Sequence, residues 1–329
     1  MSGKKGNVTI IDIAEKANVT NITVSRAFNK PELVKPETRE RILAIAREMN
    51  YSPNAFARTL KGSQSNIIGL VTDSTFNPVY SEITKTLCRE AAAKGYSVMM
   101  FETDGSEEAE ARAISVLFSY KASGILLSPV RDSQNYTPAY LEQAEAFNIP
   151  IVLIDRDIPN KNLPGVFLDN YEIGMKASQY LANFNEKSIL IIGGPSDSEI
   201  TQDRIAGLRK LLKKKNVDIQ TIYSEYDYEK ALPKIRDAFQ SLDFTPERII
   251  GVNGLISLAA IKVARETNLN NVQFFSIDEV PNSDIFGFHV PCIVNDPRAW
   301  GKNVSEMIFG LVDGKEVEHR LFVHGNLKE

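Results

Sequence analysis

The spacing of apolar residues changes near residue 65. Before that point, apolar side chains recur every three or four residues over short stretches, which is typical of amphipathic helices. After it, continuous apolar runs of strand length alternate with amphipathic stretches, which is typical of parallel sheets covered by helices on both faces. The pattern predicts an all-α head at 1–53, a short connecting helix and linker at 54–65, and an α/β body of two doubly wound parallel-sheet lobes at 66–329.

Two short helices are predicted at the start of the head. Thr9 and Asp12 have the spacing of a capping box, which satisfies the free N–H groups at the start of a helix. Asn18 can end this helix in a left-handed turn. Thr20 is then the expected cap of a second helix over 21–29.

A third helix is predicted to begin at Pro36, because a proline at the first helical position loses no needed N–H group. Pro53 is expected to end it. Two short helices joined by about three residues and braced by a third form a helix-turn-helix, which places the start of its second helix in the DNA major groove. A three-helix packing unit without DNA contacts is the alternative.

The second helix and its surroundings carry side chains that suit DNA. Asn pairs with adenine, Arg pairs with guanine, and an aliphatic side chain contacts the methyl group of thymine. Hydroxyl groups hold phosphates and set the register on the duplex. The candidate DNA-binding residues of the head are Thr9, Thr20, Asn21, Ile22, Thr23, Ser25, Arg26 and Asn29.

The formal net charge of -4 conceals an asymmetry. Residues 1–62 contain 11 Lys and Arg against 6 Asp and Glu, a balance of +5, so the rest of the chain carries -9. A basic head on a larger acidic body is typical of a nucleic-acid-binding module attached to a soluble domain. A merely solvated basic surface is the alternative.

The connecting segment has two parts. Residues 54–60 have a helical composition but are too few for a stable isolated helix, and a polar stretch with Gly and Ser follows. Such a segment can fold when it docks on DNA, with apolar side chains inserted into the minor groove. A plain connector is the alternative.

Three runs, 8–29, 34–39 and 50–60, resemble the DNA-binding head of the LacI/GalR family of transcriptional regulators. The base-reading positions that the resemblance implies are Asn21, Ile22 and Arg26. In the connecting segment it implies a hinge helix that meets the minor groove at Ala57 and Leu60, and Asn54 is a further DNA-binding candidate there.

In the body, polar residues follow the apolar runs. Parallel α/β sheets bind ligands outside the carboxyl ends of their strands. Carboxylate, amide and guanidinium groups suit a polyhydroxylated ligand, since they hydrogen-bond its hydroxyls while an aromatic ring packs on its apolar face. The candidates are Asp73, Phe76, Ser128, Asp155, Arg156, Asn253 and Asp278, with Arg204 near a helix start. For each of them, a loop polar group or a helix cap is the alternative.

The body also resembles that of the LacI/GalR family, which is similar to periplasmic sugar-binding proteins with two lobes, a cleft and crossover strands. The resemblance implies that Asp155 holds sugar hydroxyls, that Arg204 is a cleft arginine, and that Asn253 and Asp278 form hydrogen bonds in the second lobe. It adds Asn295 as a crossover residue that touches the ligand. The cleft arginines suit a sugar phosphate or a sugar acid, and a neutral sugar held by an Asp–Arg pair is equally consistent.

Two positions depart from the family pattern. Ile22 stands where many members carry a polar base reader, and Gly254 stands where many members have Asp. The first departure bears on the preferred operator sequence, and the second bears on the contacts with the ligand.

Several classes of protein are disfavoured. No apolar run reaches the length of a membrane span, and no apolar signal region follows the N-terminal lysines, so neither a membrane protein nor an exported binding protein is expected. Only Cys88 and Cys292 occur, which fits a reducing cytoplasm. The glycines at 193 and 194 complete no nucleotide-binding motif, and zinc-protease and serine-hydrolase motifs are absent from the sequence. No cofactor, metal or catalytic residue is therefore expected.

These features together predict a sequence-specific transcriptional regulator. We expect a repressor of carbohydrate-utilisation genes whose affinity for operator DNA changes when a sugar or sugar derivative enters the cleft between the lobes. A homodimer is expected to read a pseudopalindromic operator, with helices over 79–93 and 256–264 as the contact surface. The alternatives are a corepressor-dependent regulator of the same fold and a sugar-modifying α/β enzyme.

Overall fold

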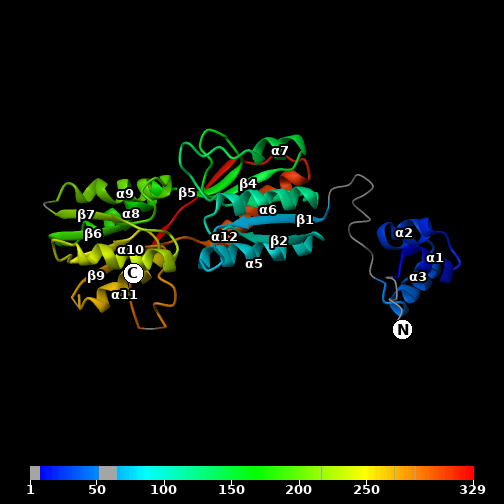
Figure 1. Ribbon diagram of the computed structural model, residues 1–329, viewed down its shortest axis with the longest axis horizontal. Helices are drawn as coiled ribbons and strands as arrows, with labels where there is room; N and C mark the ends of the chain where they lie inside the picture. Colours follow the sequence, from blue (N-terminus) through cyan, green and yellow to red (C-terminus); the bar gives the residue numbers. More distant parts are fainter. Residues whose placement is uncertain (1–7, 52–64, 216, 270, 286) are drawn as a thin grey trace. The chain divides into compact units, whose positions relative to one another are not determined.

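The computed structural model describes residues 8–51, 65–215, 217–269, 271–285 and 287–329 (Figure 1). The chain divides into two compact units, the head, Met1–Ser65, and the body, Asn66–Glu329. The candidates Asn54, Ala57 and Leu60 lie outside the described residues, so their DNA contacts stay predictions.

The predicted helices of the head are confirmed. Its described elements are α1 (Ile10–Lys16), α2 (Asn21–Asn29), a 3-10 turn (Pro31–Leu33) and α3 (Pro36–Glu48). Ile13, Val24 and Ile42, one from each α-helix, are fully buried at the centre. A core this small needs well-defined helix ends, because short helices are marginal on their own.

The helix ends of the head follow local chemistry. Thr9 and Asp12 form the capping box, with Thr9 N–H donating to the Asp12 carboxylate at 2.7 Å. Asn18 takes a left-handed φ of 50° after α1, and Thr20 accepts from the N–H of Thr23 at 3.2 Å. The predicted end of the third helix is wrong: α3 stops at Glu48, because Asn50 turns the chain with a φ of 52° before Pro53 is reached.

The body contains two six-stranded sheets, each flanked by helices, as its alternating pattern predicts. Lobe 1 has the strand order β11 (Arg320–Val323), β5 (Gly165–Leu168), β4 (Ile151–Asp155), β3 (Gly124–Leu127), β1 (Ile67–Thr72) and β2 (Ser97–Glu102), with α5 (Pro78–Ala93), α6 (Glu107–Ser119), α7 (Tyr140–Ala146) and α12 (Pro297–Val312). Its paired strands are parallel throughout.

Lobe 2 repeats this architecture with one difference. Its strand order is β12 (Asn326–Lys328), β10 (Cys292–Val294), β9 (Gln273–Ile277), β8 (Arg248–Gly251), β6 (Ser188–Gly193) and β7 (Asp218–Tyr223), with α8 (Asn170–Leu181), α9 (Glu199–Leu212), α10 (Tyr228–Gln240) and α11 (Gly254–Glu266). The edge strand β12 runs antiparallel to β10, whereas the other neighbours are parallel. The doubly wound α/β fold class is confirmed.

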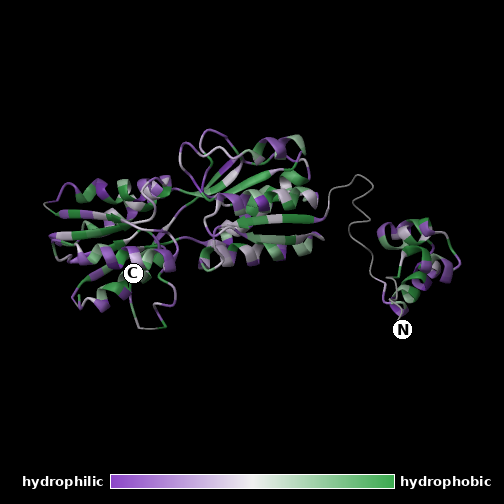
Figure 2. Ribbon diagram, in the orientation of Figure 1, coloured by the Kyte–Doolittle hydropathy of each residue, from purple (hydrophilic) through white to green (hydrophobic). Residues whose placement is uncertain are grey.

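Burial explains several of the strands that the sequence reveals, although β5 was missed despite being buried along its whole length. The central strands β3, β4 and β8 are buried along nearly their whole length, so their side chains are apolar at successive positions (Figure 2). The sequence did not reveal β5, β7, β10 and β12. The edge strand β7 mixes polar and apolar residues because it is only partly buried, and β10 and β12 have three residues each.

The chain passes between the lobes three times: from β5 to α8, from β10 to α12, and from β11 to β12. These crossovers make each lobe discontinuous in sequence. Because the carboxyl ends of both sheets lie next to the crossovers, a ligand that binds there contacts both lobes and lies beside the crossover segments.

Helices α8 and α9 pack with their backbones unusually close. A Cβ atom on Gly174 would lie 2.3 Å from the carbonyl oxygen of Arg204, and one on Gly207 would lie 2.3 Å from the carbonyl oxygen of Tyr171. Any larger residue would separate the helices. The two glycines thus fix the position of Arg204 relative to α8.

None of the helices in the described part of the chain combines the length and the apolar character needed to span a membrane.

Candidate functional site

On the head, one face of α2 is available to a partner. Val24 and Ala27 are buried against α1 and α3, whereas Asn21 and Arg26 are exposed. Ile22 is 59% exposed, and Ile11 and Leu33 of the head are each 55% exposed. An apolar side chain in this position is free to contact another molecule.

The hydroxyl groups of the head are first of all helix caps. Thr9 and Thr20 cap α1 and α2, and the hydroxyls of Thr20 and Thr23 lie 3.0 Å apart. The Asn29 amide donates to the Ser25 hydroxyl at 3.4 Å. Because a hydroxyl has two acceptor lone pairs and a donor, these roles leave capacity for a phosphate.

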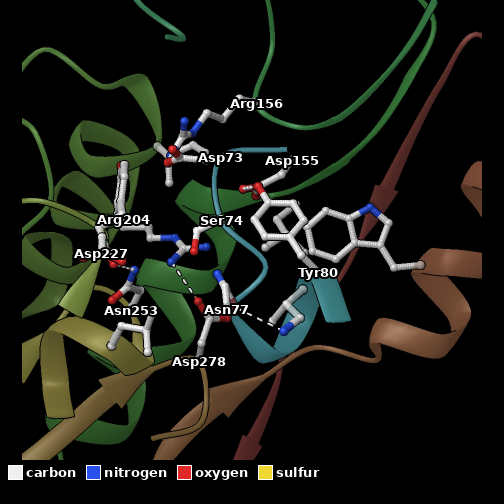
Figure 3. A pocket seen from close by; sticks show the side chains of 16 residues that line it. Asp73, Ser74, Asn77, Tyr80, Asp155, Arg156, Arg204, Asp227, Asn253 and Asp278 are labelled. Carbon is white, nitrogen blue, oxygen red and sulfur yellow. Dashed lines mark hydrogen bonds and ion pairs between the residues drawn. The ribbon is translucent and has the colours of Figure 1, made fainter. Parts of the chain in front are cut away.

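The body has a cavity of about 60 Å³ between its lobes, lined by residues from the carboxyl ends of both sheets (Figure 3). Six of the candidates line it: Asp73, Asp155, Arg156, Arg204, Asn253 and Asp278. The sequence prediction that strand ends from both lobes converge is therefore supported by the geometry.

On the lobe 1 side, Arg156 is bound on two sides. Its Nη2 donates to the Asp73 carboxylate at 3.1 Å. Its Nη1 donates to the carbonyl oxygens of Pro129 at 3.1 Å and Val130 at 3.2 Å. Burial alone would lower the pKa of this guanidinium, but neighbouring groups, Tyr80 and Asp73 foremost, raise it above its usual value. Arg156 is consequently a fixed cation with its charge already compensated.

Asp155 is held by Tyr80, which lies in the first turn of α5. The Tyr80 hydroxyl donates to the Asp155 carboxylate at 2.8 Å and lies 2.7 Å from the Ser128 hydroxyl. Since the single phenolic hydrogen goes to Asp155, Ser128 is the donor to Tyr80. Burial, and then the charge of Asp155, raise the pKa of Tyr80 well above its usual value, so Tyr80 remains a donor.

On the lobe 2 side, Arg204 connects the cavity to two crossovers. Its Nη1 donates to the Asp278 carboxylate at 3.1 Å and to the carbonyl oxygen of Val252 at 2.6 Å. Its Nε donates to Asn170 at 2.8 Å, at the start of α8. Asp278 in turn accepts from Asn295 at 2.9 Å, between β10 and α12. Burial raises the pKa of the Asp278 carboxyl, and the Arg204 charge opposes this shift.

Asp155 and Asp278 occupy matching places in the two lobes. Each follows the last buried residues of a strand, β4 or β9, and each has a left-handed backbone, with φ of 67° and 65°. Non-glycine residues adopt this conformation at a cost in free energy, and such strain concentrates at functional sites. The strained turns aim both carboxylates into the cavity.

Several lining residues are also helix caps. The side-chain oxygen Oδ1 of Asn253 accepts from Ile256 N–H at 2.7 Å at the start of α11, and its side-chain amide donates to the carbonyl oxygen of Tyr226 at 3.2 Å. Asp227 caps α10. The helix-cap alternative therefore applies to Asn253, which has less capacity left for a ligand than Asp155 or Asp278.

Three candidates do not line the cavity. Phe76 is 63% exposed on the loop that follows β1. Ser128 is buried behind Tyr80, and Asn295 lies behind Asp278 in the crossover. Their predicted role as ligand contacts stays a prediction: Phe76 is exposed to solvent, and the other two reach the cavity only through a neighbouring side chain.

The aromatic residues of the cavity were missed by the sequence analysis. Tyr80, Tyr226 and Trp300 line it, together with the polar residues Ser74 and Asn77. Trp300 is the single tryptophan of the chain, and its indole N–H donates to the carbonyl oxygen of Val166 at 3.1 Å. The three aromatic residues sit at the starts of α5 and α12 or after the edge strand β7, where no continuous apolar run marks them.

The departure at Gly254 has a steric cause. A Cβ atom at this position would lie 2.1 Å from the carbonyl oxygen of Glu279. The start of α11 packs so closely on the chain after β9 that only glycine fits. Lobe 2 therefore offers no side chain at 254 to a ligand.

The two helices of the predicted dimer surface differ in exposure. The helix over 256–264 belongs to α11, in which most side chains are buried within lobe 2, although Lys262 is exposed. Its part in the dimer surface stays a prediction. α5 keeps an exposed outer side, which includes Lys85, Cys88 and Arg89.

Within the described ranges, no cluster of His, Cys, Asp and Glu side chains has the arrangement of a metal site.

Comparison with known proteins accounts for both units. The family described as bacterial regulatory proteins, lacI family, matches residues 9–54, and the periplasmic binding protein domain matches residues 68–316. The HTH-type transcriptional regulator DegA of Bacillus subtilis is 30% identical over 263 residues, which cover 78% of this chain and 76% of DegA. The chain belongs to the lacI family of bacterial regulatory proteins.

Other lacI-family members agree with this assignment. The ribose operon repressor of Bacillus subtilis is 27% identical over 308 residues, which cover 92% of this chain and 91% of that repressor. The structure of the lac repressor dimer bound to operator and the anti-inducer ONPF has the same fold, with a TM-score of 0.82, 23% identity and 98% of each chain covered. As a family member, the chain is a DNA-binding transcriptional regulator and not an enzyme.

The pair of Arg204 and Asp278 is expected to stabilise the body. Replacing Asp278 with Asn keeps the side-chain shape and tolerates the left-handed backbone, but leaves Arg204 buried without a counter-ion. We expect the free energy of unfolding to fall by about 3 kcal/mol in urea denaturation.

The matched control is Asp104→Asn. Asp104 also has a left-handed backbone and pairs with Lys230 at 2.6 Å, but its side chain is 80% exposed. An exposed pair contributes at most about 1 kcal/mol. Equal losses in the two variants would show that Arg204 is not dependent on Asp278.

Proposed function

We propose that this regulator represses carbohydrate-utilisation genes in the cytoplasm, and that a neutral sugar in the inter-lobe cavity lowers its affinity for operator DNA. The observation that carries the proposal is the charge of the cavity. Both arginines that line it are already paired with carboxylates inside it. The cavity therefore has donors and acceptors for hydroxyl groups but no cation to spare for an anion.

The charge inventory favours a neutral ligand over a sugar phosphate or a sugar acid. The charged lining groups are two arginines, Arg156 and Arg204, and four carboxylates, Asp73, Asp155, Asp227 and Asp278. An added anion would face a surplus of negative charge, and one unit pair at about 4 Å costs about 4 kcal/mol at an effective dielectric constant of 20. An arginine that turned to a phosphate would leave its own aspartate buried and unpaired.

The polar and aromatic lining suits a small sugar. Asp155 and Arg204 present an acceptor and a donor from opposite lobes, which is the arrangement that fixes a hydroxylated ring in one orientation. Tyr226 and Trp300 offer apolar faces for its C–H groups. The name of the ribose operon repressor, one of the similar proteins, agrees with a pentose or hexose.

The hydrogen bonds around Arg204 support a coupling between the ligand and the head. A ligand that binds Asp278 or Arg204 acts on Asn170 and Asn295, which lie at two of the three crossovers. A changed lobe angle alters how two heads of a homodimer meet an operator. Coupling of about 1 to 3 kcal/mol, or about 5- to 150-fold in affinity, is typical. A corepressor acting through the same bonds is the second candidate.

The exposed face of α2 supports operator reading by Asn21, Ile22 and Arg26, with Thr9, Thr20, Thr23, Ser25 and Asn29 as phosphate-holding or positioning candidates. For operator binding, we predict that Arg26→Ala weakens binding to a duplex selected from a random pool by about 1 to 3 kcal/mol, because Arg pairs with guanine. Fluorescence anisotropy at several salt concentrations measures this loss.

The control for operator binding is Arg47→Ala, which removes the same charge from an exposed position on α3. It should alter only the salt-dependent part of binding, which arises from counter-ion release. If both variants weaken specific and non-specific binding equally, Arg26 does not read the sequence.

The exposed Ile22 is predicted to contact thymine methyl groups. Replacing each dT of the selected half-site in turn by deoxyuridine removes one methyl group, and at the contacted position binding should weaken about fourfold, the effect of about 0.8 kcal/mol. In Ile22→Ala the penalty at that position should vanish. A penalty that persists unchanged in the variant would assign the contact to another residue.

For the effector, Trp300 is a natural probe, because it is the only tryptophan and lines the cavity. Titration with neutral pentoses and hexoses should change its fluorescence for at least one sugar, and that sugar should lower operator affinity. The corresponding sugar phosphates and acids should have no effect. Arg204→Ala should bind operator but lose the response, whereas Asp104→Asn should keep it. Binding of phosphates alone would contradict the proposed charge selection.

A further inference from the structure

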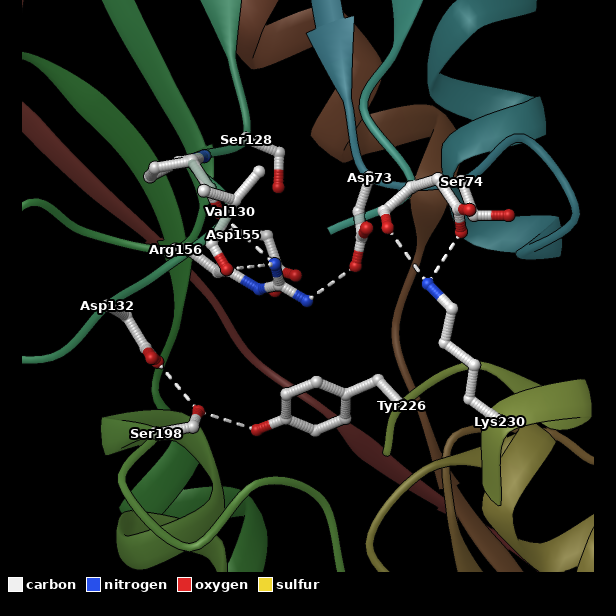
Figure 4. Close-up of polar contacts among 12 residues, drawn as sticks. Asp73, Ser74, Ser128, Val130, Asp132, Asp155, Arg156, Ser198, Tyr226 and Lys230 are labelled. Atoms are coloured by element: carbon white, nitrogen blue, oxygen red, sulfur yellow. Dashed lines mark hydrogen bonds and ion pairs between the residues drawn. The ribbon is translucent and has the colours of Figure 1, made fainter. Parts of the chain in front are cut away.

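A second set of contacts joins the lobes at the start of α9, the helix that also carries Arg204. The loop after β3 in lobe 1 reaches the start of α9 in lobe 2. There, one carboxylate oxygen of Asp132 accepts from the Ser198 hydroxyl at 2.9 Å and from the Ile200 N–H at 3.1 Å (Figure 4). Two residues further along the loop, Gln134 donates to Glu199. The lobes therefore touch through a built polar contact.

Asp132 supplies a helix cap that α9 lacks within its own lobe. Ser198 is the N-cap residue of α9, yet its side chain makes no capping bond to the helix. The first N–H groups of a helix need an acceptor, and a negative charge is favourable at this end. Asp132 meets both needs from the other lobe. It is only 4% exposed, so the contact is shielded from water.

A chain of hydroxyl groups connects this cap to the cavity. The Tyr226 hydroxyl lies 2.7 Å from that of Ser198 and 2.6 Å from that of Thr201. Because the Asp132 carboxylate only accepts, Ser198 donates to it, Tyr226 donates to Ser198, and Thr201 donates to Tyr226. Burial, and then the Asp132 charge, raise the pKa of Tyr226 to about 12, so the chain keeps its proton.

Tyr226 lines the cavity and also contacts the opposite lobe. The guanidinium carbon of Arg156 lies 5.3 Å from the centre of its ring. The tyrosine ring packs on Gly194, where a Cβ atom would lie 2.4 Å from a ring carbon. A ligand that contacts this ring therefore contacts a group bonded to the cap.

The loop that carries Asp132 is held in place beforehand. The fully buried Glu110 accepts from Val130 N–H at 2.6 Å and from Tyr140 at 2.6 Å, and also from Tyr136. The carbonyl oxygen of Val130 accepts from Arg156. Both backbone polar groups of Val130, two residues before Asp132, are thus bonded within lobe 1, and little ordering is needed to form the cap.

We propose that Asp132 is an inter-lobe latch: a positioning residue that caps α9 across the cleft and favours closed lobes. Separation of the lobes removes both donors from Asp132 and the cap from α9, so the latch opposes opening. Arg204 lies on the same helix, α9, so the latch also affects where Arg204 stands in the cavity and thereby how well an effector binds. This regulatory consequence rests on the proposed function.

The opposite rim provides a contrast. Asp104 and Lys230 also join the lobes, but their side chains are 80% and 43% exposed. Water and salt screen such a pair. The buried contact at Asp132 is therefore the one expected to control opening.

Hydrogen exchange on the full-length protein tests the latch. In Asp132→Ala, amide exchange in a peptide spanning 197–203 should be about fivefold faster than in the wild type, the effect of removing one helix cap. Quenching of Trp300 fluorescence by acrylamide should increase as well, because the cavity opens. Asp197→Ala is the matched control: it removes the same charge at the same helix start, from a side chain that lies 3.7 Å from Arg131 and is 62% exposed.

The outcomes separate the latch from its alternatives. If Asp132→Ala matches Asp197→Ala in both readouts, the proposal is overturned. If exchange at 197–203 rises without added quenching of Trp300, Asp132 is a local cap and not a latch. If Asp132→Ala exchanges faster throughout the chain, the variant is generally destabilised, and Ser198→Ala is then the deciding variant. It removes one donor to Asp132 and keeps the charge. A smaller rise in exchange at 197–203 and in Trp300 quenching supports the latch, and no rise overturns it.

The test does not depend on the proposed function. Exchange and quenching are measured without DNA or sugar, so they stand even if no operator or effector is found. Conversely, the wild type could bind operator and sugar as proposed while Asp132→Ala leaves hydrogen exchange and Trp300 quenching unchanged. That result would overturn the latch and leave the proposed function standing.

Discussion

The ion pair between Arg204 and Asp278 is the interaction on which the cleft depends. It puts a cation and an anion at the meeting point of two lobes and ties both to crossover segments through Asn170 and Asn295. A buried pair of this kind needs hydrogen-bond partners for its other polar atoms in order to be stabilising. Val252 and Asn170 supply them for Arg204, and Asn295 supplies one for Asp278. A ligand that competes for Arg204 or Asp278 must therefore disturb the crossover segments between the lobes.

The rest of the body keeps that pair in position. Close packing of α8 on α9, which two glycines allow, sets the height of Arg204. The left-handed turn at the end of β9 aims Asp278. Opposite them, Arg156 and Asp73 form a second compensated pair in lobe 1. Both arginines of the cavity are thus paired with carboxylates, while the head carries the positive charge that DNA requires.

The sequence predicts those site residues that directly follow buried strands. Asp155 and Asp278 come after continuous apolar runs, so their place at a sheet edge follows from pattern alone. Tyr226 follows the mixed edge strand β7, and Trp300 reaches the cavity through a crossover that only the fold reveals. Asp132 lies in a loop whose capped helix belongs to the other lobe, and such long-range bonds leave no local signal in the sequence.

The glycine at 254 limits how ligand preference can diverge in this protein. Because the carbonyl oxygen of Glu279 occupies the space of a Cβ atom, an acidic side chain cannot be introduced there by a single substitution without moving the segment that follows β9. Homologues that evolve from this chain toward new sugars, or laboratory selections that seek them, are confined to the other walls of the cleft. Altered recognition should accordingly arise at lining residues other than position 254, in either lobe.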